Sequence, residues 1–320
     1  MTIHPTYTII IPHYNSPTGL SNLLATIPID PRIQVIVVDD RSTKEQNELE
    51  RVIALDGRVE FYRNGSGVQS AGACRNEGLR HARGKWILFA DADDLFLDGF
   101  LTILTKYENR EEDVILFCPT SRDVQTGLVS DRHILWQIAI ENYIKDATPK
   151  NRALLQYTCN PPWSKMIRRR LIETNHIEFA QTLVYNDLLF AAKVGCALQS
   201  FWVTNEGIYC TQKGKGSLST LRGEAVFDIR TQAFLECYLY LREHLSKDEF
   251  HLIPTRGAQH LVEAYMNHMP IRKLWEIYRL FRKNHVKMLK TEYFNPLWSF
   301  KAFRDRLHLQ KTSKKCDTPV

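Results

Sequence analysis

The amino-acid sequence predicts an α/β fold, a Rossmann-like and mostly parallel sheet with helices on both faces, followed by a helical C-terminal region. Three observations lead to this prediction. Strand-like and helix-like segments alternate along the first hundred residues. The strand-like runs at residues 7–11 and 35–38 are rich in β-branched residues, which is typical of strands that are covered on both faces. From residue 224 onward the spacing of apolar residues is helical.

The first ninety residues contain four short strand-like runs, and these are the predicted strands: residues 7–11, 35–38, 59–62 and 86–90. Helical spacing fills the intervals and predicts three helices: residues 18–27, 43–55 and 71–83. Ser42 or Thr43 is expected to cap the second helix, and Gly84 to end the third. Parallel strands joined by helices in this order are connected by right-handed crossovers.

The next part of the chain alternates less regularly. The predicted elements are helices at residues 99–107, 131–145 and 186–195, a strand at 114–118, and a short strand pair at 201–203 and 207–210. The run Asn160-Pro161-Pro162-Trp163 predicts an irregular connection. From Glu224 to about Leu309 the pattern is helical. We therefore expect an α/β domain over residues 1–220 and a basic helical region over residues 221–320.

The composition is that of a globular protein, with 44% hydrophobic and 24% charged residues, which excludes a disordered or fibrous chain. Seven cysteines are scattered without a C-x-x-C pair, so a disulfide framework and a zinc site are excluded and a reducing compartment is indicated. The N-terminus lacks the pattern of a signal peptide, and no window holds 18 successive apolar residues. We expect a cytoplasmic protein.

The formal net charge of +6 is unevenly distributed. Residues 270–320 carry thirteen Lys and Arg against four Asp and Glu, a net +9, which leaves −3 for the rest. Apolar residues recur at near-helical spacing within residues 296–309, which favours an amphipathic helix on an anionic membrane surface, at the inner face of the cell membrane. Packing of this stripe on the α/β domain is the alternative, and both stay open. No recognition motif accompanies the charge, so nucleic acid is not an expected partner.

Acidic residues follow two of the predicted strands at the point where each strand ends. Asp39-Asp40 follow the second strand, and Asp91, Asp93 and Asp94 follow the fourth. Ligands of open parallel sheets bind outside the carboxyl ends of the strands. Carboxylates held close together repel one another unless a cation lies among them, and Mg²⁺ or Mn²⁺ prefers carboxylate and phosphate oxygens. These residues predict a metal–diphosphate site.

Two other nucleotide-binding patterns are excluded. Gly65 and Gly67 lack the third glycine of a dinucleotide fingerprint, because Ser70 stands in its place, and they follow the third strand rather than the first. The sequence also contains no G-x-x-x-x-G-K-[ST] loop.

Six segments follow one another along the chain in this order: TIIIPHYNSPTGLSNLLATI, VIVVDDRST, NGSGVQSAGACRNEGLRHARGKWILFADADD, PPWSKMIRRRLIETNHIEF, LVYNDLLFAAKV and YCTQKGKGSLS. They resemble segments of the inverting family 2 glycosyltransferases with the GT-A fold, and the last is similar to bacterial polysaccharide-assembly members. The resemblance covers about residues 5–220. It implies a hexosyltransferase that moves a sugar from a UDP-sugar donor to a hydroxyl of a lipid-linked glycan acceptor in surface polysaccharide biosynthesis, with Mg²⁺ or Mn²⁺ as cofactor.

The resemblance also implies roles for residues on the nucleotide side. Asp39 matches the acid that binds the uracil ring, and Pro12 and Tyr14 would flank the base. Arg75 matches a basic residue that contacts the nucleotide. Lys213 takes the place of a family arginine, as does its neighbour Lys215, and would approach the diphosphate when the loop closes. A solvated loop without ligand contact is the alternative.

On the metal and acceptor side, Asp91 and Asp93 match the D-x-D motif. Asp93 is the expected direct metal ligand, and Asp91, the second candidate ligand, would lie nearer the ribose. Asp94 is expected to cap the next helix. Asp187 matches the catalytic base, which takes the proton of the acceptor hydroxyl as that oxygen attacks the anomeric carbon and inverts its configuration. The alternative is that Asp187 only caps the helix that follows.

Two departures from the family pattern stand out: Arg41 replaces the usual Gly after the strand-two acids, and Asn186 replaces the usual Glu before the base. Two other functions stay open at this stage. One is a nucleotidyltransferase on a related scaffold, although its usual Gly-rich loop after the first strand is absent. The other is a sugar-nucleotide-binding protein without catalysis.

Overall fold

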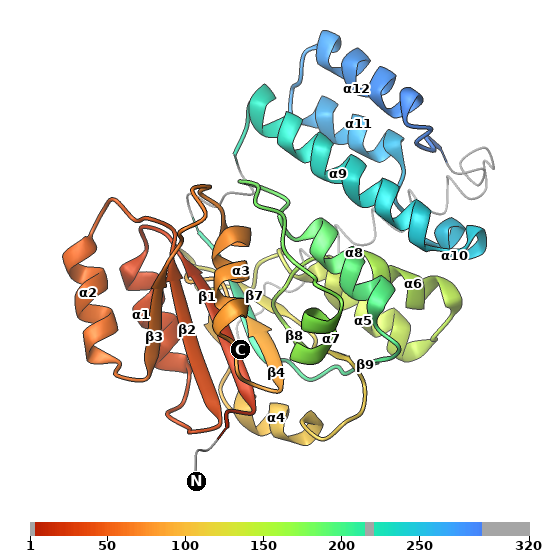
Figure 1. Cartoon of the computed structure of the whole chain (residues 1–320). Helices are drawn as coiled ribbons and strands as arrows, with labels where there is room; N and C mark the ends of the chain where they lie inside the picture. The colour runs from red at the N-terminus through yellow and green to blue at the C-terminus, as the bar shows by residue number, and fades with distance from the viewer. Residues whose placement is uncertain (1–3, 215–220, 290–320) are drawn as a thin grey trace.

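The structure is a computed structural model that describes residues 4–214 and 221–289 (Figure 1). It confirms the α/β class, with C-terminal helices beyond the sheets. The larger sheet has seven strands in the order β3 (Val59–Arg63), β2 (Ile33–Asp39), β1 (Tyr7–His13), β4 (Trp86–Phe89), β8 (Lys165–Arg168), β6 (Val114–Leu116) and β9 (Phe201–Val203). Neighbours are parallel except β8, which is antiparallel to both β4 and β6.

The first half of this sheet follows the predicted alternation. Its connecting helices are α1 (Pro17–Thr26), α2 (Gln46–Leu55) and α3 (Ala71–His81). The helix α2 begins later than predicted, because Ser42 uses its backbone N–H and hydroxyl to bond the Asp39 carboxylate instead of capping a helix. The strand order changes direction at β1, which lies between β2 and β4, and ligand sites of open α/β sheets lie at such a point.

Pro12 lies within β1, where its missing N–H has a simple explanation. The carbonyl of Ile10 accepts from the backbone N–H of Ala90, so alternate residues of β1 direct their backbone groups toward β4. Pro12 is two residues further on, past the last β1–β4 pair, Ile10 with Phe89. Its nitrogen therefore faces the side where β4 has already ended, and no ladder hydrogen bond is lost.

A second, three-stranded sheet has the order β5 (Leu95–Phe96), β10 (Tyr209–Lys213) and β7 (Thr120–Asp123). The predicted pairing of residues 201–203 with 207–210 is wrong. The first segment, β9, pairs with β6 in the large sheet, and the second belongs to β10, which pairs with β5 and β7. The small sheet thus joins the segment after β4 to a strand more than one hundred residues later.

The remaining helices of the α/β part are α4 (Phe100–Tyr107), α5 (Ile134–Lys145), α6 (Pro149–Thr158), α7 (Arg169–Thr174) and α8 (Leu188–Ala197). Within residues 221–289, four helices follow: α9 (Glu224–His244), α10 (Lys247–Leu252), α11 (Gly257–Met266) and α12 (Ile271–Lys283). In Figure 1 these four form a separate layer beside α6 and α8. The predicted amphipathic segment 296–309 lies outside the described residues.

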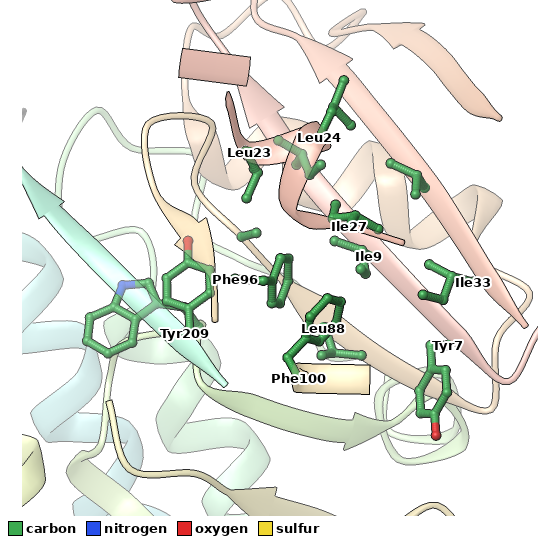
Figure 2. Close-up of a cluster of buried hydrophobic side chains, with 14 of the residues drawn as sticks. Tyr7, Ile9, Leu23, Leu24, Ile27, Ile33, Leu88, Phe96, Phe100 and Tyr209 are labelled. Atoms are coloured by element: carbon green, nitrogen blue, oxygen red, sulfur yellow. The ribbon is translucent and has the colours of Figure 1, made fainter. Parts of the chain in front are cut away.

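The main core lies between the large sheet and the helices on one of its faces (Figure 2). Ile9 and Leu88 of the strands pack with Leu23 and Leu24 of α1, whereas alternate strand residues such as Ile10 face a second core on the other side. Each fully buried side chain of this kind contributes about 1.5–3 kcal/mol. Within residues 4–214 and 221–289, no helix is long and apolar enough to cross a membrane.

Candidate active site

The N-terminal half of α3 holds the segment that leads to α8. Ser70 caps α3 and its hydroxyl also donates to the carbonyl of Thr182 (2.7 Å). The Asn76 side chain exchanges two hydrogen bonds with the backbone of Phe179 (2.8 and 2.9 Å). A side chain at Gly72 would place its Cβ 2.2 Å from the carbonyl oxygen of Ala180, so only glycine permits this close approach. The helix and the segment therefore form one rigid unit.

Arg75 lies at the centre of this unit and is buried. Its Nη2 donates to Asp91 Oδ1 (2.6 Å) and its Nη1 donates to Asn186 Oδ1 (2.8 Å). Its guanidinium lies 5.3 Å from the centre of the Phe179 ring. One side chain thus joins the acidic motif after β4 to the residue that precedes Asp187.

Asp187 occupies the residue position that directly precedes α8. The position is therefore that of a cap, but the carboxylate itself makes no capping hydrogen bond. Burial raises the pKa of the Asp187 carboxyl, and the negative charge of Asp91 adds to this rise, although the positive charges of Arg75 and Lys165 oppose it. A raised pKa makes a carboxylate a stronger base at neutral pH.

Asp93 and Asp94 have different surroundings. The Asp93 side chain reaches solvent, yet protein surrounds most of it, and this desolvation together with the charge of Asp91 raises its pKa. Asp94 is buried and accepts hydrogen bonds from the Tyr209 hydroxyl (2.9 Å) and from the backbone N–H of Gln212 (2.7 Å). The expected capping role of Asp94 is wrong, because α4 has Gly99 at its N-cap.

The donor set after β4 fits a divalent cation. In the part of the chain that the structure describes, no three His, Cys, Asp or Glu residues form a preassembled metal cluster. Asp91 and Asp93 nevertheless supply two carboxylates one residue apart, and their mutual repulsion is the condition that a cation would relieve. Mg²⁺ and Mn²⁺ sites of this kind use one or two carboxylates and complete their shell with phosphate oxygens and water.

At the ends of β1 and β2, the strand register brings Pro12 beside Val38 and His13 beside Asp39. Asp39 is buried. Burial alone would raise the pKa of its carboxyl, but hydrogen bonds from Ser42 and His13 more than offset this and lower it. The ring N–H of a nucleotide base would therefore donate to an Asp39 oxygen that already accepts a hydrogen bond from Ser42 or His13. Tyr14 follows β1 and is exposed.

The chain after β1 also approaches the acidic motif. A Cβ at Gly19 would lie 2.9 Å from the carbonyl oxygen of Ala92 and 3.3 Å from the Cα of Asp93, so the start of α1 packs directly on this motif. The ends of β1 and β4 thus border one site, as the strand order predicts.

Lys213 lies at the end of β10, where its ammonium bonds Asp131 Oδ1 (2.9 Å) rather than Asp91 or Asp93. The cation whose charge acts on Asp93 is Arg132, which also donates to the carbonyl of Gln212 (2.8 Å). Lys215 lies outside the described residues. Closure of the loop onto a diphosphate stays a prediction.

The structure also shows what the sequence pattern did not reveal. Arg132, Tyr209 and Lys165 surround the site, but no role was expected for them. Lys165 and Tyr209 lie within segments that resemble the family, which was the available signal, whereas Arg132 lies outside any such segment. Arg41, which replaces a usual Gly, has a left-handed φ of 60°, so the conformation that favours glycine is kept.

A known protein family matches the sequence of this chain. The family model for glycosyl transferase family 2 matches residues 8–175, just over half of the chain. The chain belongs to glycosyl transferase family 2. Its fold and family are therefore those that the sequence motifs predicted.

Among curated proteins, the chain is 30% identical over 115 residues to an uncharacterized glycosyltransferase of Rickettsia conorii, a match that covers 35% of this chain and 18% of the relative. It is 27% identical over 108 residues to the GalNAc(5)-diNAcBac-PP-undecaprenol beta-1,3-glucosyltransferase of Campylobacter jejuni, covering 33% of this chain and 35% of the relative. These matches span well under half of the relatives' length.

Solved structures share the fold over most of the chain. Residues 1–349 of TarS of Staphylococcus aureus in complex with UDP-GlcNAc are similar with a TM-score of 0.58 and 17% identity, covering 87% of this chain and 92% of that fragment. The mannosyltransferase PcManGT of Pyrobaculum calidifontis, in complex with GDP-Man and Mn²⁺, has a TM-score of 0.57 and 15% identity, covering 98% and 83%. At this identity the likeness shows the fold.

Proposed function

We propose that this family 2 glycosyltransferase transfers a hexosyl residue from a UDP-sugar to a hydroxyl of a glycan acceptor, with inversion at the anomeric carbon. The observation that carries the proposal is the position of Arg75, which bonds Asp91 and Asn186 at the same time. This bridge supports a single site that contains both the acidic motif expected at the donor diphosphate and the expected base, Asp187.

Asp187 is the proposed general base. Its carboxylate takes the proton from the acceptor hydroxyl as that oxygen attacks the anomeric carbon from the face opposite the leaving diphosphate. Its raised pKa supports this role, because a base whose pKa lies nearer the working pH accepts a proton more readily. Arg75 holds the neighbouring Asn186, so the backbone at Asp187 is fixed relative to Asp91.

On the donor side, Pro12, Tyr14 and Asp39 are proposed to bind the uracil, and Arg75 and Asp91 the rest of the nucleotide. Asp93 and Asp91 are the proposed ligands of Mg²⁺ or Mn²⁺, which when bound would neutralise the charge of the diphosphate. The complex of TarS with UDP-GlcNAc supports a UDP-sugar donor, and the Mn²⁺ in the PcManGT complex supports a metal. Lys213 is proposed to reach the diphosphate when its loop closes.

A lipid-linked glycan of a surface polysaccharide is the proposed acceptor. The undecaprenol-linked substrate in the name of the Campylobacter relative supports this class. The family assignment favours glycosyl transfer over the nucleotidyltransferase alternative. We also propose that residues 1–220 form the catalytic domain and residues 221–320 a helical domain beside it.

An anionic membrane surface at the cytoplasmic face is the proposed place of work. The outer faces of α11 and α12 expose apolar and aromatic side chains: Val262, Tyr265, Met266, Ile271, Trp275 and Tyr278. Basic side chains of α12 are exposed beside them: Arg279, Arg282 and Lys283. Aromatic and basic groups on one surface are typical of proteins that lie on anionic lipid, and this lipid would also hold the proposed acceptor.

The activity is tested by following UDP release from a panel of UDP-sugars, with UDP-GlcNAc first, in the presence of Mn²⁺ and an undecaprenyl-diphosphate-linked glycan. We expect release that EDTA abolishes and that Asp93→Asn lowers by at least about a hundredfold, since the metal stabilises the leaving group. Asp98→Asn, an exposed acid after β5, is the control and should keep full activity. UDP binding without release on any acceptor would instead identify a sugar-nucleotide-binding protein.

A further inference from the structure

The residue two positions before Asp187 has an unusual backbone. Tyr185 has a φ of 58°, in the left-handed region that bulky residues rarely adopt. Such a conformation persists only when the surrounding structure holds it. The contacts that hold Tyr185 come from the C-terminal helices.

The Tyr185 hydroxyl donates to Oε1 of Glu263 on α11 (2.8 Å). Arg230 of α9, which is buried, lies with its guanidinium 5.5 Å from the centre of the Tyr185 ring. Its Nη1 is 3.6 Å from the same Glu263 oxygen. Ring and hydroxyl of Tyr185 are thus both held by one ion pair of the helical layer.

A buried histidine contacts the ion pair of Arg230 and Glu263 on its glutamate side. His260 is buried on α11, with Nδ1 3.8 Å from Glu263 Oε2 and Nε2 3.0 Å from the Thr231 hydroxyl of α9. Burial and the positive charge of Arg230 lower the pKa of His260 to about 4, so at neutral pH this side chain is uncharged. Glu263 therefore faces a neutral imidazole on this side, and its Oε1 contacts Arg230 and accepts from the Tyr185 hydroxyl.

The other flank of Asp187 also contacts the helical layer. The Cys237 thiol of α9 lies 3.7 Å from the carbonyl oxygen of Leu188. Tyr185, Asn186 and Leu188 are thus held by α11, α3 and α9 respectively, and Asp187 stands between them.

From this arrangement we infer that Tyr185 and Glu263 are positioning residues: their hydrogen bond fixes the left-handed turn that aims the Asp187 carboxylate at the acceptor. The helical layer then takes part in catalysis rather than only in binding or solubility. The inference rests on the proposed role of Asp187 as base.

The chain offers a matched control at the same interface. The Tyr157 hydroxyl of α6 donates to Glu249 Oε1 of α10 (3.1 Å), so here too a tyrosine bonds a glutamate of the helical layer. Tyr157 lies far along the chain from Asp187 and carries no proposed role. Tyr157→Phe therefore removes an equivalent bond without touching the turn of the base.

The test compares full-length Tyr185→Phe, Tyr157→Phe and Asp187→Asn with the unaltered protein. Steady-state UDP release is measured with UDP-GlcNAc, Mn²⁺ and the undecaprenyl-diphosphate-linked glycan, and active-site concentration is obtained by calorimetric titration with UDP. We expect Tyr185→Phe to lower kcat about tenfold to a hundredfold, the range for a slightly misplaced catalytic group, with an unchanged KM for the donor and unchanged UDP stoichiometry. Tyr157→Phe should leave kcat unchanged. Glu263→Gln, which keeps an acceptor for the hydroxyl, should retain more activity than Glu263→Ala.

Hydrogen exchange gives a readout that needs no substrate. Peptides covering residues 180–191 should exchange faster in Tyr185→Phe than in Tyr157→Phe. Equal exchange, or a wild-type kcat in Tyr185→Phe while Asp187→Asn is inactive, would overturn the inference and leave the proposed function intact. Full activity in Asp187→Asn would instead overturn the proposed base.

Discussion

Two buried carboxylates near the site have opposite electrostatic states. Asp39 accepts from Ser42 and His13, and these bonds lower its pKa. Asp94 accepts two hydrogen bonds, against three for Asp39, and burial together with the charges of Asp91 and Asp93 raises its pKa well above the ordinary value. The number of donors and the distance to other acids decide the sign of the shift.

This difference predicts how stability depends on pH. Because the folded pKa of Asp94 lies above its unfolded value near 4, folding favours the protonated form, and stability falls as pH rises from the unfolded toward the folded pKa. Asp94→Asn keeps an acceptor for Gln212 N–H and lacks this penalty. Its free energy of unfolding, measured with urea and EDTA, should therefore improve relative to the unaltered protein between pH 4.5 and pH 7.5.

The control for this effect is Asp98→Asn, whose difference from the unaltered protein should not change with pH in this way. A difference for Asp94→Asn that stays constant over the same range would contradict the raised pKa of Asp94.

Sequence reasoning identified the chemistry of single residues better than their partners. Arg75 was expected to contact the nucleotide, but its bonds to Asp91 and Asn186 join residues 16 and 111 positions away. Such contacts are set by the packing of α3 against the segment before α8, which no local pattern encodes. Lys213 was expected near the diphosphate, whereas its partner in the structure is Asp131.

At the scale of elements, the predictions held for β1 to β4, of which β1, β2 and β4 are buried along their whole length. They failed where a strand is short and polar. The strand β7 has the polar sequence TSRD and is hydrogen-bonded to β10. The strand β5 has only two residues. The strand β8 and helix α7 were missed because the preceding prolines indicated an irregular connection.

The proposed membrane surface can be tested on helix α12, because this helix exposes Trp275, Arg279 and Lys283. Each basic group near an anionic membrane contributes about 1 kcal/mol. The triple variant Trp275→Ser, Arg279→Ser, Lys283→Ser should therefore bind vesicles that contain phosphatidylglycerol at least about tenfold more weakly in a sedimentation assay, and high salt should weaken the unaltered protein likewise.

Trp202→Ser is the matched control, because Trp202 is an exposed tryptophan on β9 rather than on α12. Equal binding of the triple variant and this control, or equal binding of the unaltered protein to neutral vesicles, would contradict the proposed membrane surface.

At the scale of the whole molecule, the acidic motif and the basic helix α12 lie in different layers of the fold. The acidic motif lies at the carboxyl ends of β1 and β4, whereas the basic α12 belongs to the helical layer beside α6 and α8 (Figure 1). The same layer contacts both flanks of Asp187 through Glu263 and Cys237. The sequence shows that the acidic and the basic residues lie in different parts of the chain. The fold adds that the helical layer, which contains the basic α12, also contacts the residues on both sides of Asp187.

The central claim is that Asp187 removes the proton of the acceptor at a site that binds the donor independently of it. The most direct test is Asp187→Asn, assayed for UDP release and, by calorimetry, for binding of UDP with Mn²⁺. We predict that release falls by about a hundredfold to ten-thousandfold, as for loss of a general base, while the UDP affinity stays within about twofold. Undiminished release by Asp187→Asn would contradict the account.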